Sequence, residues 1–154
     1  MLPRLALEQK HGKRETDATL YEGFNSIKNF YLNLLGELRS GDTYYVLGAS
    51  YGELRSWEKE FFERYHKKRV QKKIHVKMLA NHDLKDRLVQ STLLNSDIKF
   101  LPKYLLSNMI VIFYNSKSFL FFLSEEPISL LIEDKEITKG FKSYFDTFWR
   151  LAKR

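Results

Sequence analysis

Cysteine is absent from the 154 residues of this sequence, so disulfide bonds, zinc ribbons and thiol nucleophiles are excluded together. Long hydrophobic runs are absent as well. The longest, such as Met109–Tyr114 and 118–123, are far shorter than the roughly 20 residues that a membrane-spanning helix requires. The N-terminus contains no hydrophobic segment of a secretory signal. We therefore expect a soluble, cytoplasmic protein without a membrane partner.

Apolar side chains are plentiful, since 44% of the residues are hydrophobic and 15% are aromatic. A chain of this length usually forms one domain around one core. The apolar content is sufficient to offset the conformational entropy that is lost when such a chain becomes ordered. We predict a polar, charged linker over residues 1–16 and one folded domain over residues 17–154.

The formal charge of +7 is concentrated in one stretch that contains no acidic residue. Its basic residues are Arg64, Lys67, Lys68, Arg69, Lys72, Lys73 and Lys77. A solvated surface is the simplest interpretation, because Lys and Arg at the end of a helix complement its dipole. His66 is interpreted as part of that solvated surface. The alternative interpretation is a weak, direct contact with nucleic-acid phosphates, which would use all of these residues except Lys77.

Hydrophobic periodicity predicts an alternating order of elements, β-α-β-α-β-α-β-β-β-β-α. This order favours an α/β fold with one mixed sheet and helices on both faces. Strands are expected at 19–22, 43–49, 74–80, 98–101, 109–114, 118–123 and 128–133, and helices at 24–38, 54–65, 81–94 and 137–151.

A ligand site is expected beyond the carboxyl ends of the first parallel strands, where ligands gather in open α/β sheets. The residues at these ends are Gly48, Ala49, Ser50, Tyr51 and Asn81. Backbone N–H groups at the start of the following helix could bind an anion there. The alternative is an ordinary capped helix start, because Ser50 and Glu53 have capping-box spacing.

Catalytic and metal-binding motifs are incomplete. The sequence lacks G-x-S-x-G, a Walker loop and G-x-G-x-x-G. His75, Lys77 and Asp83 approach the H-x-K-x4-D signature of the phospholipase D superfamily, but the gap before the aspartate is one residue too long and no second copy exists. His82 and Asp83 have no third ligand at a suitable spacing, so we predict no metal site and no cofactor.

Several local strings, spread over residues 17–150, carry a family resemblance. They lie at 20–29 (LYEGFNSIKN), 45–50 (YVLGAS), 110–117 (IVIFYNSK), Ile128–Glu133 and 145–149 (FDTFW). On these strings the chain resembles the C-terminal effector domain of the TrmB family of archaeal transcription regulators, which has a phospholipase D-like fold. The resemblance implies transcription regulation, a small-molecule effector, a homodimer, and DNA contact through an N-terminal winged helix-turn-helix domain. We expect that domain to be missing here unless the sequence is a fragment of a longer protein.

The resemblance also indicates where the catalytic motif of phospholipase D-like enzymes would lie. That motif spans the strand before the hairpin, which places Asn108, Ile110 and Asn115 at its three positions. None of these side chains can perform the catalytic role, so we expect a sensing and dimerising domain and not an enzyme. Asn108 and Asn115 are added to the predicted ligand contacts. The aromatic C-terminal helix is the expected dimer surface, with Phe148 or Trp149 available to a partner.

Overall fold

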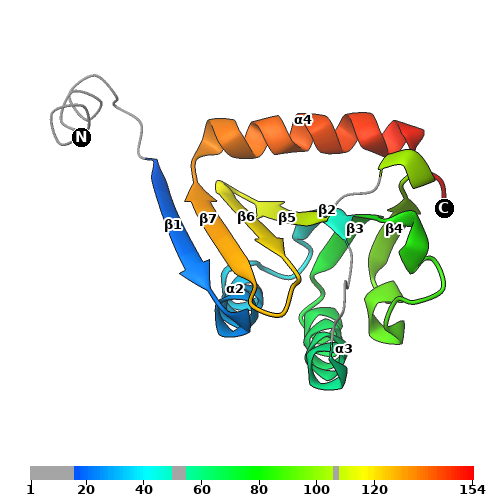
Figure 1. The fold of residues 1–154 in the computed structure, drawn as a ribbon, viewed down its shortest axis with the longest axis horizontal. Helices are drawn as coiled ribbons and strands as arrows, with labels where there is room; N and C mark the ends of the chain where they lie inside the picture. Colours follow the sequence, from blue (N-terminus) through cyan, green and yellow to red (C-terminus); the bar gives the residue numbers. More distant parts are fainter. Residues whose placement is uncertain (1–15, 50–54, 106–107) are drawn as a thin grey trace, which may run out of the picture.

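A computed structural model describes residues 16–49, 55–105 and 108–154. These residues form one seven-stranded sheet in the order β1-β7-β6-β5-β2-β3-β4 (Figure 1). Neighbours β2, β3 and β4 are parallel, and every other pair is antiparallel. The predicted mixed α/β sheet is therefore confirmed. Its strands are β1 (Asp17–Glu22), β2 (Thr43–Ala49), β3 (His75–Ala80), β4 (Ser96–Phe100), β5 (Met109–Tyr114), β6 (Lys117–Phe122) and β7 (Ile128–Glu133).

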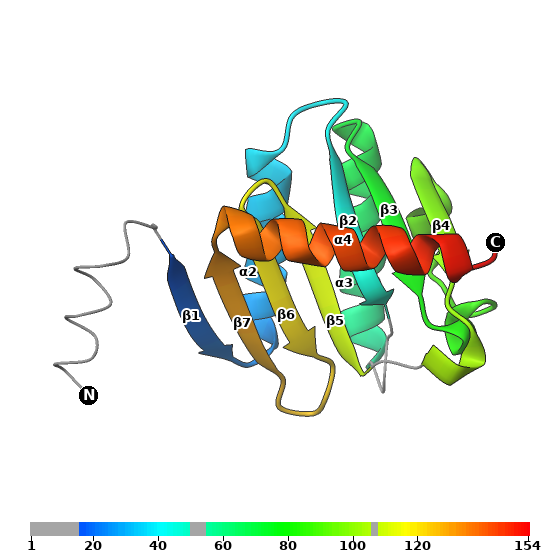
Figure 2. The same ribbon diagram turned by 90° about the horizontal axis from the view of Figure 1, so that it is seen from above.

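Helices cover both faces of the sheet, as predicted. α2 (Phe24–Glu37) and α3 (Ser56–Gln71) lie on one face, and α4 (Lys135–Leu151) crosses the other (Figures 1 and 2). In the part of the chain that the structure describes, no helix is long and apolar enough to cross a membrane.

The helix predicted over 81–94 is not formed. Two short 3-10 turns, η1 (His82–Leu84) and η2 (Gln90–Leu93), occupy this segment, and a third, η3 (Lys103–Leu105), follows β4. The buried guanidinium of Arg69 binds the carbonyl oxygens of Thr92 and Leu94 at 3.4 and 2.7 Å. These carbonyls are therefore already engaged by a side chain, which favours a tethered loop over a continuous α-helix.

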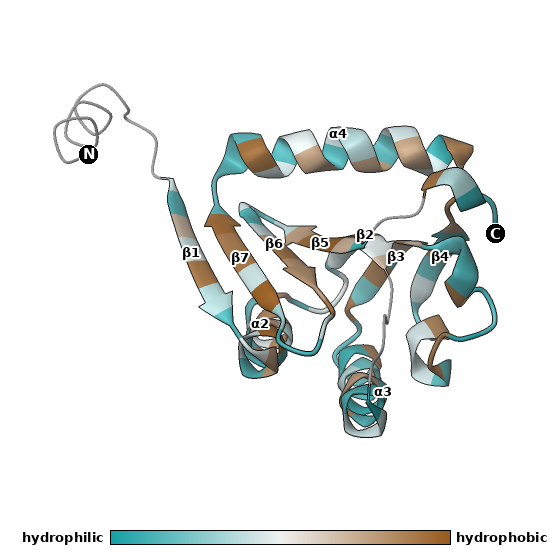
Figure 3. Ribbon diagram, in the orientation of Figure 1, coloured by the Kyte–Doolittle hydropathy of each residue, from teal (hydrophilic) through white to brown (hydrophobic). Residues whose placement is uncertain are grey.

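The larger hydrophobic core lies between the sheet and the α2–α3 pair. The apolar stripe of α2 is buried in it, with Ile27 and Leu34 fully inaccessible to solvent. Strand β2 divides its side chains by alternation: Tyr44 and Val46 join this core, while Tyr45 packs against the second core beneath α4. This division explains why β2 is apolar on both faces, and Figure 3 shows the hydrophobic residues along the central strands.

α4 is held at both ends. Asp134 caps its N-terminus by accepting hydrogen bonds from the N–H groups of Glu136 and Ile137. Phe145 is completely buried against the sheet, and Trp149 stacks on it at a centroid distance of 5.6 Å. Trp149 is thus half-buried against the sheet, and the most exposed aromatic residue of this helix is Tyr144 at 62%. The aromatic pair chosen as the dimer contact does not point freely into solvent.

Candidate functional site

The carboxyl ends of β2 and β3 lie at the same edge of the sheet as the start of β5. Gly48 has a φ of +80°, and the register between β2 and β3 shifts between Leu47 and Ala49. This bulge requires a residue that tolerates the left-handed region, which glycine does without strain. Beyond it, the N–H of Asn81 donates to the carbonyl of Ala49 at 2.9 Å, and both residues are buried.

A hollow of about 420 Å³ opens at this edge between the sheet and α4. Its volume lies in the range typical of small-molecule sites, and its walls are mostly apolar. Tyr104 and Tyr144 are 79% and 62% exposed, so their phenol groups lie at its rim. The hollow is lined by Leu47, Gly48, Leu101, Tyr104, Leu105, Met109, Val111, Phe141, Tyr144 and Phe148.

The predicted ligand residues do not form one site. Gly48 lines the hollow, while Ala49 and Asn81 lie beside it in the backbone hydrogen bond described above. Ser50 and Tyr51 lie outside the described residues. Asn108 precedes β5 and Asn115 follows it, so a whole strand of about 20 Å separates them. The inclusion of Asn115 in the same site is therefore wrong.

Most residues that line the hollow were not predicted, because apart from Tyr104 and Tyr144 they are apolar and have the pattern of core residues. The usable signal was the alternation of β5, which sends Met109 and Val111 to the α4 face while Ile110 and Ile112 enter the α2–α3 core. Combined with the apolar stripe of α4, this alternation locates a second apolar layer. It does not show that the layer is incompletely filled.

The catalytic position that the resemblance implies is apolar in the structure. Ile110 is 3% exposed in the core below α2 and α3, and Asn108 is exposed just before the strand. The near-match motif is also dispersed: His75 begins β3, whereas Asp83 lies in η1 beyond its other end. His75 instead contacts Asp97, with 3.6 Å between Nε2 and Oδ2.

Arg69 is not available to nucleic acid, contrary to the prediction. Its guanidinium is fully buried and donates to the carbonyl oxygens of Ile74 at 3.0 Å and Asn95 at 2.8 Å, in addition to the η2 carbonyls. Its Nε donates to Nδ1 of His66 at 3.0 Å. Burial and the neighbouring Arg69 charge lower the pKa of His66 to about 3, so the solvated interpretation of His66 is also wrong.

The other predicted nucleic-acid contacts remain on the surface. Arg64, Lys67 and Lys68 are exposed on α3, and Lys72 and Lys73 are exposed where that helix ends. The ammonium of Lys72 also donates to the carbonyl of Leu35. Nucleic-acid contact through these residues stays a prediction.

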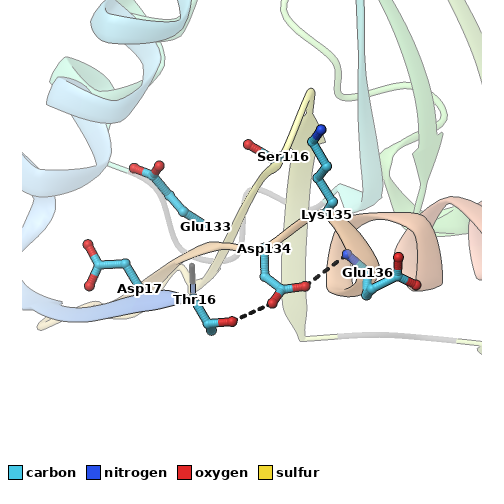
Figure 4. Close-up of a pocket in the computed structure, with 7 residues that line it drawn as sticks. All are labelled: Thr16, Asp17, Ser116, Glu133, Asp134, Lys135 and Glu136. Carbon is cyan, nitrogen blue, oxygen red and sulfur yellow. Dashed lines mark hydrogen bonds between the residues drawn. The ribbon is translucent and has the colours of Figure 1, made fainter. Parts of the chain in front are cut away.

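An acidic hollow of about 530 Å³ lies at the opposite edge of the sheet, where β1 and β7 meet α4 (Figure 4). The Asp134 carboxylate accepts hydrogen bonds from Glu136 N and from the Thr16 hydroxyl, the latter at 2.5 Å (Figure 4). Asp134 therefore acts as a helix cap. Within the described ranges, no three acidic or histidine side chains gather closely enough to hold a metal ion.

This arrangement of sheet and helices is the phospholipase D-like fold. No family model and no curated protein matches the chain. Solved structures do match it. NucT from Helicobacter pylori is 17% identical, with a TM-score of 0.63, and the match covers 90% of this chain and 99% of NucT. Nuc from Salmonella typhimurium, a phospholipase D family member, is 7% identical, with a TM-score of 0.60 and coverage of 90% and 97%.

Phosphatidylserine synthase from Haemophilus influenzae is also similar, at 8% identity and a TM-score of 0.57, over 92% of this chain and 40% of the synthase. The prediction that the chain is not an enzyme is contradicted by these neighbours, because the fold they share with it is an enzyme fold. The prediction rested on Asn108, Ile110 and Asn115, which cannot perform catalysis at one motif, and these three residues do not define the activity of the whole molecule. At these identities the likeness establishes the fold.

Proposed function

We propose that this chain binds a small, largely apolar ligand in the hollow between α4 and the carboxyl edge of β2. The observation that carries the proposal is the apolar cavity of about 420 Å³ beside Gly48. Burial of apolar ligand surface there would supply the main driving force. The phenol groups of Tyr104 and Tyr144 at the rim provide hydrogen-bonding groups for a polar end of the ligand.

The proposal includes the ligand-sensing role implied by the resemblance to TrmB effector domains. α4 contributes Phe141, Tyr144 and Phe148 to the hollow, and η3 contributes Tyr104 and Leu105. A ligand that contacts both elements stabilises one arrangement of α4 relative to the edge of the sheet. Such a differential contact is what a regulator of transcription would require of its effector domain.

Binding of 1-anilinonaphthalene-8-sulfonate, which has an apolar ring system and one anionic group, tests the site. The wild-type chain is expected to show saturable fluorescence enhancement with one site per chain. Met109→Trp places a larger side chain in the hollow, and we expect it to weaken binding by about tenfold or more, equivalent to about 1.4 kcal/mol.

Leu93→Trp is the matched control, because Leu93 is 52% exposed in η2 and does not line the hollow. It is expected to bind the probe as the wild type does. Urea denaturation of both variants establishes that they are folded. Equal binding by Met109→Trp and the wild type would contradict the proposed site.

A further inference from the structure

Two lysines from neighbouring strands each contact the same tryptophan of α4. The Nζ of Lys77 on β3 lies 4.4 Å from the centroid of the Trp149 ring, and the Nζ of Lys99 on β4 lies 4.6 Å from it. Because both distances are measured to the same centroid, the two nitrogens can be no farther apart than the sum of the two distances. Phe145 stacks on the same indole, which fixes the ring that anchors both lysines.

No carboxylate of the described residues neutralises either ammonium group. Among the described residues, no Asp or Glu oxygen lies within 4.0 Å of Lys77 or Lys99. Asp97 is opposite Lys77 in the strand register, but its carboxylate contacts His75 at 3.6 Å and Arg154 at 3.5 Å. Lys99 donates one hydrogen bond to the carbonyl of Trp149, and an ammonium group has three donors.

The chain near this lysine pair is basic as well. The C-terminal tail runs beside β4, where Lys153 and Phe100 exchange two backbone hydrogen bonds. Arg150, Lys153 and Arg154 are exposed on the end of α4 and on this tail. Cation–π contact holds the two lysines in place but does not remove their mutual repulsion.

We propose that Lys77 and Lys99 form a binding site for a phosphate group above Trp149. A phosphate presents several acceptor oxygens, so it can accept charge-assisted hydrogen bonds from both ammonium groups at once. Its negative charge would also relieve the repulsion between them. The site lies over β3 and β4, apart from the apolar hollow, and does not depend on the function proposed for that hollow.

The fluorescence of Trp149 reports directly on this site. Trp57→Phe removes the other tryptophan, which is 43% exposed on α3, and leaves Trp149 as the sole indole. Titration with inorganic phosphate, at an ionic strength held constant with sodium chloride, is expected to change the emission in a saturable manner. In this background Lys77→Gln with Lys99→Gln should weaken phosphate binding by about tenfold or more.

Two further pairs of substitutions separate the site from nonspecific charge and from unfolding. Lys67→Gln with Lys68→Gln removes the same charge from the exposed surface of α3, and its phosphate affinity should be unchanged. Lys77→Arg with Lys99→Arg keeps the charge and should retain binding. Urea denaturation of each variant verifies that it is folded.

Parallel titrations with phosphate and with a twelve-residue oligothymidylate distinguish the source of the phosphate group. Tighter binding of the oligonucleotide, lost in the glutamine pair at Lys77 and Lys99, would assign the site to a nucleic-acid backbone. No gain over inorganic phosphate would assign it to a small phosphorylated molecule. No saturable response to either probe, or an equal response in that glutamine pair, would overturn the proposal.

Discussion

Arg69 illustrates how neighbouring residues in one charged run take opposite roles. It lies one position after Lys68, which is exposed, yet its own side chain is fully buried. A buried guanidinium is tolerated only when its donors are satisfied, and here carbonyl oxygens from the loop after α3 and from the segment before β4 accept them. Arg69 thus connects α3 to the β4 side of the sheet.

Arg69→Leu is predicted to lower the free energy of unfolding by at least about 3 kcal/mol, because it removes the guanidinium donor from four carbonyl oxygens, of which, in the described part of the chain, only those of Ile74 and Asn95 retain another donor. Arg64→Leu on the same helix changes an exposed side chain and should cost less than about 0.5 kcal/mol. Urea denaturation followed by circular dichroism measures both values. Equal, small effects would contradict the structural role of Arg69.

His66 makes the stability of the fold dependent on pH. Its folded-state pKa of about 3 lies below the ordinary value of 6.5, so the unfolded chain binds the proton more tightly. This contribution to stability is complete above about pH 6.5 and is lost as the pH falls toward 3, by about 1.4 kcal/mol per pH unit.

The substitution His66→Gln retains an acceptor for Arg69 but does not titrate. Its free energy of unfolding should therefore change less than that of the wild type between pH 6.5 and 4. Thr147→Ala, at an exposed position of α4 whose side chain does not titrate, should keep the wild-type slope. A wild-type slope that survives in His66→Gln would contradict the assignment.

Among the elements, α4 shows the clearest agreement between sequence and structure. An acidic residue before an amphipathic stripe predicts a capped helix, and Asp134 is that cap. Asp134→Ala should lower the free energy of unfolding by about 1 kcal/mol. Glu136→Ala removes an exposed side chain of the first turn and should have a smaller effect. Thermal denaturation of the two variants decides whether the cap contributes as expected.

The elements that sequence reasoning missed depend on contacts distant in the chain. All seven strands were predicted, because their alternation and length are local properties. The false helix over 81–94 arose from leucines at helical spacing, one of which, Leu94, is 52% exposed in the structure. The contact that engages this segment is made by Arg69, more than 20 residues earlier. No window of local sequence contains that information.

At the scale of the whole molecule, the candidate site was less predictable than the fold. The rule that ligands bind at the carboxyl edge of a parallel sheet selected Gly48, which lines the hollow proposed as the site, because strand direction fixes that edge. The size of the hollow depends on how α4 packs across the sheet, and the spacing of hydrophobic residues in the sequence does not predict that packing. The polar residues Asn108 and Asn115 were predicted as ligand contacts, yet they lie at opposite ends of β5.

The homodimer stays a prediction, and the structure changes the surface on which we place it. α4 does not cover β1 or the far ends of β6 and β7 (Figure 2). Ser118 contacts Thr138 of α4, so it lies on the α4 face of the sheet. Strand alternation and register place Leu20, Phe122 and Ile128 on the same face, where they are 65%, 47% and 51% exposed. Contiguous exposed apolar surface of this kind marks interaction sites. Sedimentation at micromolar concentration is expected to show a dimer that Leu20→Lys with Ile128→Lys dissociates.

Leu93→Lys with Leu94→Lys is the control for this experiment, because both leucines are equally exposed in a different part of the molecule. It should leave the dimer intact. A wild-type chain that sediments as a monomer would refute the prediction, and dissociation by both pairs would show that charge alone, and not this surface, is responsible.

The bridge between Lys153 and Phe100 has a consequence for how sheets of separate molecules can join. β1 and β4 are the two outer strands, and an outer strand offers unpaired backbone groups to another chain. At β4, the C-terminal tail already occupies the outward N–H and carbonyl of Phe100, so a neighbour's β1 cannot pair with this end of β4 while the tail is in place. Among the described residues, β1 has no such bridge on its outer side. Association through that strand joins two molecules and then stops, which favours closed pairs over fibres.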